Sequence, residues 1–222
     1  MDSGLTPSEL ERLFSAVEQA LAANRLALNA ADPFNANHGD HMVAVFQAAV
    51  QSARSHPEFD LPQAMRAAAE SLAALPDNGS ARLYAGGLEH LAAQFQAYGV
   101  TTPDLLAYVR STLASKPAEG AVVAVQPEKP ADPKSGQVLK SLMAGLAAWS
   151  RAESGKPVDG NPLDMGTLFE FGMAYMQARQ RGGARLQVLA DAACSVSPLS
   201  QVPHRAESGR IAIQALLQAM QS

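Results

Sequence analysis

Apolar residues recur at intervals of three and four along most of the chain, the spacing that places them on one face of an α-helix. The first such stretch follows Thr6-Pro7-Ser8-Glu9, a capping-box pattern with proline at the first helical position. Turns rich in Gly, Pro and Asn separate it from further stretches of the same kind. The expected helices cover residues 7–21, 39–55, 60–75, 81–98, 102–113, 135–154, 168–176, 186–194 and 206–220. The pattern therefore predicts an all-α protein, a large bundle of about eight antiparallel helices.

A proline-rich segment interrupts the helical pattern near the middle of the chain. Residues 115–134 contain Pro117, Pro127, Pro130 and Pro133, with scattered charges around them. Proline removes a backbone donor and clashes with the preceding turn, so no helix is expected across these prolines. Neither flanking half shows a complete core of its own. We therefore expect one domain over residues 1–222, with an internal Pro-rich loop at about 115–134.

Composition narrows the class of protein. The 222 residues are 47% hydrophobic, 5% aromatic and 17% charged, which suits a soluble helical protein packed through small side chains. The net charge of −4 and the lack of Lys/Arg clusters give no reason to expect a nucleic acid or a membrane as partner. No apolar run approaches the ~20 residues that span a bilayer. The single Cys194 excludes an internal disulfide, and together with the absence of a signal pattern it predicts a cytoplasmic protein.

The most polar stretch between two helices runs from Leu28 to Met42. It contains Asn29, Asn35 and Asn37, the last two in alternating positions of an expected extended segment before the helix start at Gly39. Unpaired N–H groups and the positive end of the macrodipole make such a helix start a natural anion site. The simpler interpretation is also open, because Asn favours turns and helix caps.

Two further polar turns precede helices. Asp77-Asn78-Gly79-Ser80 offers a glycine, which lets the backbone approach a ligand, and a serine hydroxyl. Arg82, shortly after it, brings a cation to the same helix start. The third turn, residues 159–165, contains Gly160 and Leu163-Asp164.

Taken together, these turns resemble the nucleotide-binding L-subunit (DhaL-like) domain of dihydroxyacetone kinase and the A subunit of fatty acid kinase. In that family a stretch close to Asp-x-Asp-x-Gly-x-Asn-Met holds two magnesium ions under the nucleotide phosphates. Asn35 and Asn37 stand at the two Asp positions, Gly39 matches, and His38 agrees with the dihydroxyacetone kinase branch. Asn29 agrees with fatty acid kinase. The family's last nucleotide turn carries an Asp, and residues 204–209 here read His-Arg-Ala-Glu-Ser-Gly.

The resemblance implies a closed helical barrel with the nucleotide at one end. It implies cofactor contacts at His38, Gly39, Gly79, Ser80 and Asp164, and degenerate metal positions at three asparagines, Asn29, Asn35 and Asn37. An amide offers magnesium an oxygen without the negative charge of a carboxylate, so the ions that catalyse phosphoryl transfer lose their main attraction. ADP or ATP with magnesium is therefore expected to bind weakly or not at all, and catalysis is expected to be impaired.

Three functions follow as hypotheses. The first is a kinase-type domain that has become a weak nucleotide-binding or protein-interaction subunit, a partner of a kinase or of a substrate-binding subunit, with a homodimer left open. The second is an active glycerone-kinase or fatty-acid-kinase type phosphotransferase, in which Asp32, Asp40 or Asp164 replaces the lost ligands. The third is a transition-metal site built on His38 and His41, three residues apart.

Overall fold

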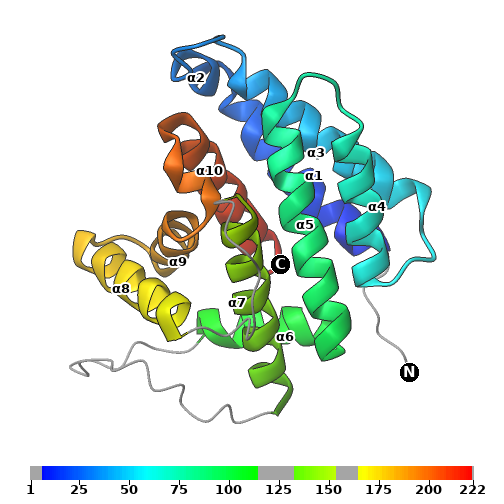
Figure 1. Ribbon diagram of the computed structural model, residues 1–222, viewed down its shortest axis with the longest axis vertical. Coiled ribbons are helices and arrows are strands. Elements are labelled where there is room, and N and C mark those ends of the chain that lie inside the picture. The colour runs from blue at the N-terminus through cyan, green and yellow to red at the C-terminus, as the bar shows by residue number, and fades with distance from the viewer. Residues whose placement is uncertain (1–6, 115–132, 154–164, 222) are drawn as a thin grey trace.

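The computed structural model describes residues 7–114, 133–153 and 165–221, and this part of the chain consists of helices joined by turns and loops, without a strand (Figure 1). The all-α prediction is therefore confirmed for the described residues. Of the Pro-rich loop expected at about 115–134, residues 133 and 134 instead begin a helix, because proline is tolerated in a first helical turn. Residues 115–132 and Asp164 lie outside the described residues. None of the described helices is long and apolar enough to cross a membrane. The helices are α1 (Pro7–Ala23), α2 (Arg25–Ala30), α3 (His38–Ser55), α4 (Leu61–Ala73), α5 (Gly79–Tyr98), α6 (Thr102–Ala114), α7 (Pro133–Glu153), α8 (Met165–Arg181), α9 (Arg185–Ser195), the 3₁₀ turn η1 (Pro198–Gln201) and α10 (Pro203–Ala219).

Local sequence signals set several of these boundaries. Asp60 caps α4 and forms a complete capping box with Gln63, so the predicted start of that helix is confirmed. The side chain of Asn78 caps α5 by accepting a hydrogen bond from the N–H of Ala81 at 2.9 Å. The same helix ends at Gly99, whose left-handed conformation (φ 60°) suits glycine.

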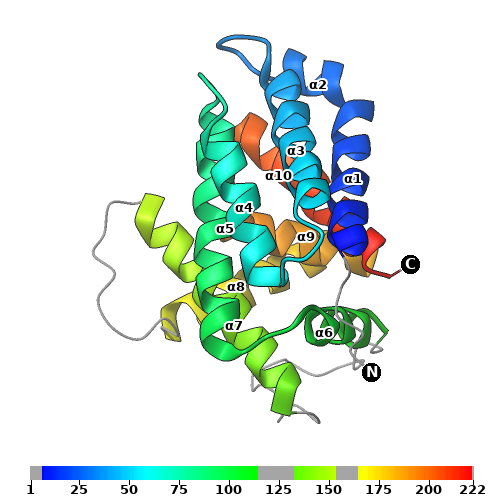
Figure 2. The ribbon, with the colours of Figure 1, turned by 90° about the vertical axis from the view of Figure 1, so that its right-hand side faces the viewer.

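The helices pack in a continuous order around the molecule (Figures 1 and 2). α1 packs against α3, α3 against α4, α4 against α5 and α5 against α7. α7 then touches α8, α8 packs against α9, α9 against α10, and α10 against α1. α2 rests on α3, and α6 packs against α7. The main core lies between these helices, and its most deeply buried side chains include Leu13, Leu21, Leu28, Met42 and Leu72.

The first polar loop differs from its prediction in two ways. Residues 25–30 form α2, a helix that the sequence pattern did not predict. Six residues are too few for a stable isolated helix, and α2 is held by the burial of Leu28, which is 1% exposed. The segment between Asn35 and Asn37 is also not extended, because Ala36 lies in the left-handed region with φ 53°.

Candidate functional site

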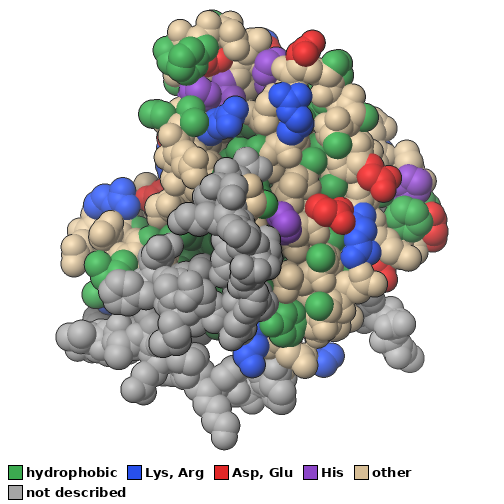
Figure 3. Space-filling model, viewed as in Figure 1, with side chains coloured by type: hydrophobic (Ala, Val, Ile, Leu, Met, Phe, Trp, Pro, Cys, Tyr) green, Lys and Arg blue, Asp and Glu red, His purple; other side chains and the backbone are tan. Residues whose placement is uncertain are grey.

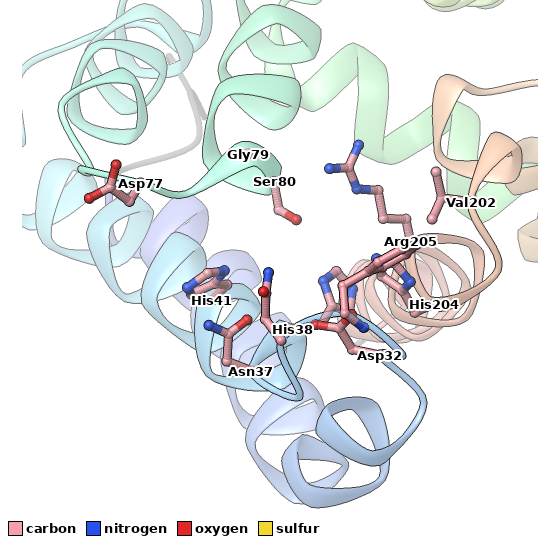
Figure 4. Close-up of a pocket in the computed structure, with 12 residues that line it drawn as sticks. Asp32, Asn37, His38, His41, Asp77, Gly79, Ser80, Val202, His204 and Arg205 are labelled. Carbon is pink, nitrogen blue, oxygen red and sulfur yellow. The ribbon is translucent and has the colours of Figure 1, made fainter.

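A cavity of about 290 Å³ opens where three helices begin (Figure 4). Its walls come from the loop before α3, the first residues of α5 and the first residues of α10, three segments far apart in the sequence. The N-terminal end of each helix carries the positive end of its dipole. In the space-filling view, His and Lys or Arg side chains gather at the upper end of the molecule (Figure 3). The lining residues are Asp32, Phe34, Asn35, Asn37, His38, His41, Asp77, Gly79, Ser80, Val202, His204 and Arg205.

Asp32 fixes the first wall. Its side chain is 7% exposed, and a carboxylate oxygen accepts a hydrogen bond from the N–H of Phe34 at 3.0 Å. That bond lowers the pKa of Asp32, and the N–H groups of Asn35 and Asn37 lower it further against the opposing effect of burial. Asp32 is therefore an ionised carboxylate that stabilises its own turn, and its oxygens already accept hydrogen bonds from backbone N–H groups.

His38 joins the first wall to the start of α10 through a buried hydrogen bond. Its Nε2 lies 2.8 Å from Oγ of Ser208 on α10, and the Ser208 hydroxyl donates to the carbonyl of Arg205 at 3.1 Å. Since that hydroxyl has one proton, this arrangement assigns Nε2–H of His38 as donor to Ser208. Burial lowers the pKa of His38 to about 4, with a further contribution from nearby His204, so the imidazole is neutral at pH 7. The two rings meet edge to face at 4.7 Å. His38 thus positions the start of α10.

The start of α5 forms the remaining wall. Asn78, besides capping α5, donates from Nδ2 to the carbonyl of His41 at 3.1 Å and so ties α5 to α3. Gly79 and Ser80 line the cavity, and the first N–H groups of a helix have no intrahelical acceptor. A Cβ atom on Gly79 would lie 3.3 Å from Nη2 of Arg205, so glycine leaves room for the guanidinium.

Arg205 is the cation of the site, and the sequence interpretation missed it. Its side chain extends from α10 towards the start of α5 (Figure 4). Its buried Nε has no hydrogen-bond partner among the described residues, where Arg205 also forms no ion pair. Arg82, which we expected to bring a cation here, is exposed and does not line the cavity. The turn at residues 204–209 was noted only for its missing Asp, although it carries the arginine.

The structure brings together most of the predicted site residues. Asn35, Asn37, His38, Gly79 and Ser80 all line the one cavity. Asp164 lies outside the described residues.

Two predicted residues lie elsewhere. Gly39 is buried against α2, where a Cβ would be only 2.1 Å from the carbonyl oxygen of Arg25. Asn29 accepts from the N–H of Asp40 at 3.1 Å and donates to its carboxylate at 2.8 Å. Asp40 also pairs with Arg25 at 2.6 Å, so it is bound away from the cavity instead of replacing a lost ligand.

The lining residues do not fit a pair of magnesium ions. Asn35 and Asn37 present amides, the Asp32 carboxylate is engaged by backbone N–H groups, and the Arg205 guanidinium adds positive charge. A hard dication prefers carboxylates and phosphate oxygens. Over the residues that the structure describes, no group of three or more His, Cys, Asp and Glu side chains is arranged to hold a metal ion. His38 and His41, the pair behind the transition-metal hypothesis, line the cavity together with His204 but belong to no such group, and Nε2 of His38 is already bonded to Ser208.

No protein-family model, no curated protein and no solved structure matches this chain, so its resemblance to the kinase L-subunit domain remains a prediction from the motifs.

Proposed function

We propose that this chain is a helical binding domain for a phosphorylated small molecule, with nucleotides as the expected class, and that it has lost magnesium-dependent phosphoryl transfer. The observation that carries the proposal is Arg205, an arginine beside a cavity at three helix starts, whose buried Nε has no hydrogen-bond partner in the part of the chain that the structure describes. Phosphate is the anion that such N–H groups and a planar guanidinium suit best. The motif resemblance supports the nucleotide.

The same site argues against ordinary kinase activity. Metal ions supply most of the positioning and charge neutralisation in phosphoryl transfer. With amides at Asn35 and Asn37, we expect no ATP hydrolysis or dihydroxyacetone phosphorylation near the 1–100 s⁻¹ typical of kinases. An active phosphotransferase remains the second candidate, because the carboxylate of Asp32 does line the cavity. Robust magnesium-dependent turnover that is lost in Asp32→Asn would favour that candidate.

We further propose that the helices close into a barrel, as the resemblance implies. Support comes from the packing order, in which eight helices contact one another in sequence and the last, α10, returns to the first, α1. The cavity then lies at one end of this ring, beside α2. A cytoplasmic location and a role as a subunit of a larger kinase system belong to the same proposal, and Leu26 and Phe34, exposed by 72% and 79%, leave apolar surface for a protein partner.

The test is to titrate the metal-free protein with ADP and ATP, with and without magnesium, and to compare it with Asn35→Asp/Asn37→Asp. The double variant restores two carboxylates at a helix start, where the dipole favours negative charge. Its melting temperature should rise when magnesium and ADP are added together, because binding stabilises the folded state. The melting temperature of the wild type should rise when ADP is added and should rise little further when magnesium is added as well. Absence of nucleotide binding to both proteins would contradict the proposal.

A further inference from the structure

We propose that the cavity binds its phosphate ester as the free anion, with Arg205 acting in place of a divalent cation and the organic group of the ligand leaving the cavity over Phe34. This inference rests on the proposed function, since it specifies how a phosphorylated ligand is held. It adds two claims: binding needs no metal, and Phe34 distinguishes an organic phosphate from an inorganic one.

The pairing of the charged groups in the cavity supports the first claim. Arg205 has no carboxylate partner within the described part of the chain. Of the two acids in the lining, Asp32 is bonded to the backbone of its own turn, and Asp77 is exposed and lies apart from Asp32, His38 and His204 (Figure 4). An unpaired cation at the N-terminal end of a helix opposes the macrodipole. An anion between Arg205 and the start of α5 would interact favourably with the guanidinium and with the positive end of the α5 dipole.

His204 gives a second and independent indication. Its imidazole is only 9% exposed and lines the cavity, yet it makes no hydrogen bond within the described residues. Its ring nitrogens are not among the fully buried atoms that lack a partner, so they are accessible to a ligand in the cavity. Its contacts are with two aromatic edges, His38 at 4.7 Å and Phe34 at 6.2 Å. A phosphate oxygen in the cavity could accept from the imidazole.

The position of Arg205 also explains why a metal is unnecessary. Its Nη2 would lie 3.3 Å from a Cβ built on Gly79, so the guanidinium stands at the start of α5, where phosphate oxygens would meet the N–H groups of Gly79 and Ser80. A dication bound to the same phosphate would be repelled by this group. A guanidinium instead binds phosphate directly through two parallel hydrogen bonds.

Phe34 supports the second claim. Its side chain is 79% exposed although it lines the cavity, and it meets His204 edge to face with an interplanar angle of 70°. The ring therefore offers exposed apolar surface beside the cavity. A nucleotide base can stack on such a ring. An organic group attached to a phosphate bound near Arg205 would pass this residue.

The experiment measures the affinities of pyrophosphate and ADP by calorimetry in EDTA, and then with magnesium. We expect both ligands to bind in EDTA, with affinities that magnesium changes less than threefold. Arg205→Gln should weaken both ligands at least tenfold, and Arg205→Lys should weaken them less. Arg82→Gln, which removes an exposed arginine from the same helix start, is the matched control and should leave both unchanged. Phe34→Ala should weaken ADP three- to tenfold and pyrophosphate not at all, whereas Leu26→Ala should affect neither.

The outcomes separate the two levels of the proposal. If neither ligand binds under any condition, both the proposed function and this inference are wrong. If ADP binds only with magnesium, the proposed function survives and the metal-free mode is overturned. The same conclusion follows if ADP binds equally well to the wild type and to Arg205→Gln, provided that the circular dichroism of the two proteins matches. If Phe34→Ala weakens pyrophosphate as much as ADP, the assignment of the organic group to Phe34 is overturned.

Discussion

The third residues of α3 and α10 occupy the same helical position and carry opposite charges. Asp40 of α3 suits the helix dipole, pairs with Arg25 and Asn29, and is bound outside the cavity. Arg205 of α10 opposes the dipole and lies beside the cavity without an ion pair among the described residues. A charged group that is paired with other groups of the protein stabilises the folded state. A charged group that lacks a partner beside a cavity destabilises the folded state unless a ligand binds to it. The comparison assigns Asp40 to structure and Arg205 to binding.

The largest expected effect concerns the packing that keeps Asp40 in its structural role. In Gly39→Ala the new Cβ would lie 2.1 Å from the backbone oxygen of Arg25 and 2.9 Å from Oδ1 of Asn29, so α2 must move away from α3. We expect the free energy of unfolding to fall by about 3 kcal/mol, at the upper end for overpacked sites. Chemical denaturation measures this. If the variant instead has normal stability but no longer binds ADP, Gly39 contacts the ligand, as the motif resemblance implied.

The next effect is the pH dependence of His38, which holds the start of α10 in place. Burial lowers the pKa of His38 from 6.5 to about 4, so between these values the unfolded chain binds more protons than the folded one. The contribution of neutral His38 to the free energy of unfolding is therefore fully present above pH 6.5. It falls as the pH drops towards 4, by up to about 1.4 kcal/mol per pH unit. Denaturation at several pH values should show this slope in the wild type and a smaller one in His38→Gln. Asp32 and Asp40, whose pKa values are lowered from 3.8, act below this range.

The equivalent substitution of half-exposed His56 serves as the control for that slope. His56→Gln changes a histidine at the end of α3 that is remote from the cavity, and it should keep the wild-type pH dependence. Equal slopes in all three proteins would contradict the role of the buried His38 to Ser208 bond.

The sequence predicted the helices better than it predicted the chemistry of the cavity. Helix spacing and caps such as Asp60 and Gly99 are local signals, and they located most elements. The motif resemblance grouped Asn35, Asn37, His38, Gly79 and Ser80, and these residues do line one cavity. It misplaced Asn29 because a tertiary contact with Asp40 decides its role. It missed Arg205 because an unpaired charge is recognised only when its surroundings are known.

The smallest and most discriminating prediction compares Asp40→Asn with Arg205→Gln in the absence of ligand. Asp40→Asn removes an exposed ion pair and a favourable dipole interaction, so the free energy of unfolding should fall. Arg205→Gln removes an unpaired cation from a helix start, and we expect a gain of a few tenths to about 1 kcal/mol. Thermal and chemical denaturation in phosphate-free buffer measure both. Because Arg205 would bind buffer phosphate, adding 10 mM pyrophosphate should reverse the order of wild type and Arg205→Gln. If Arg205→Gln instead destabilises the free protein as Asp40→Asn does, the guanidinium is a structural group, and the contrast between the two helix starts disappears.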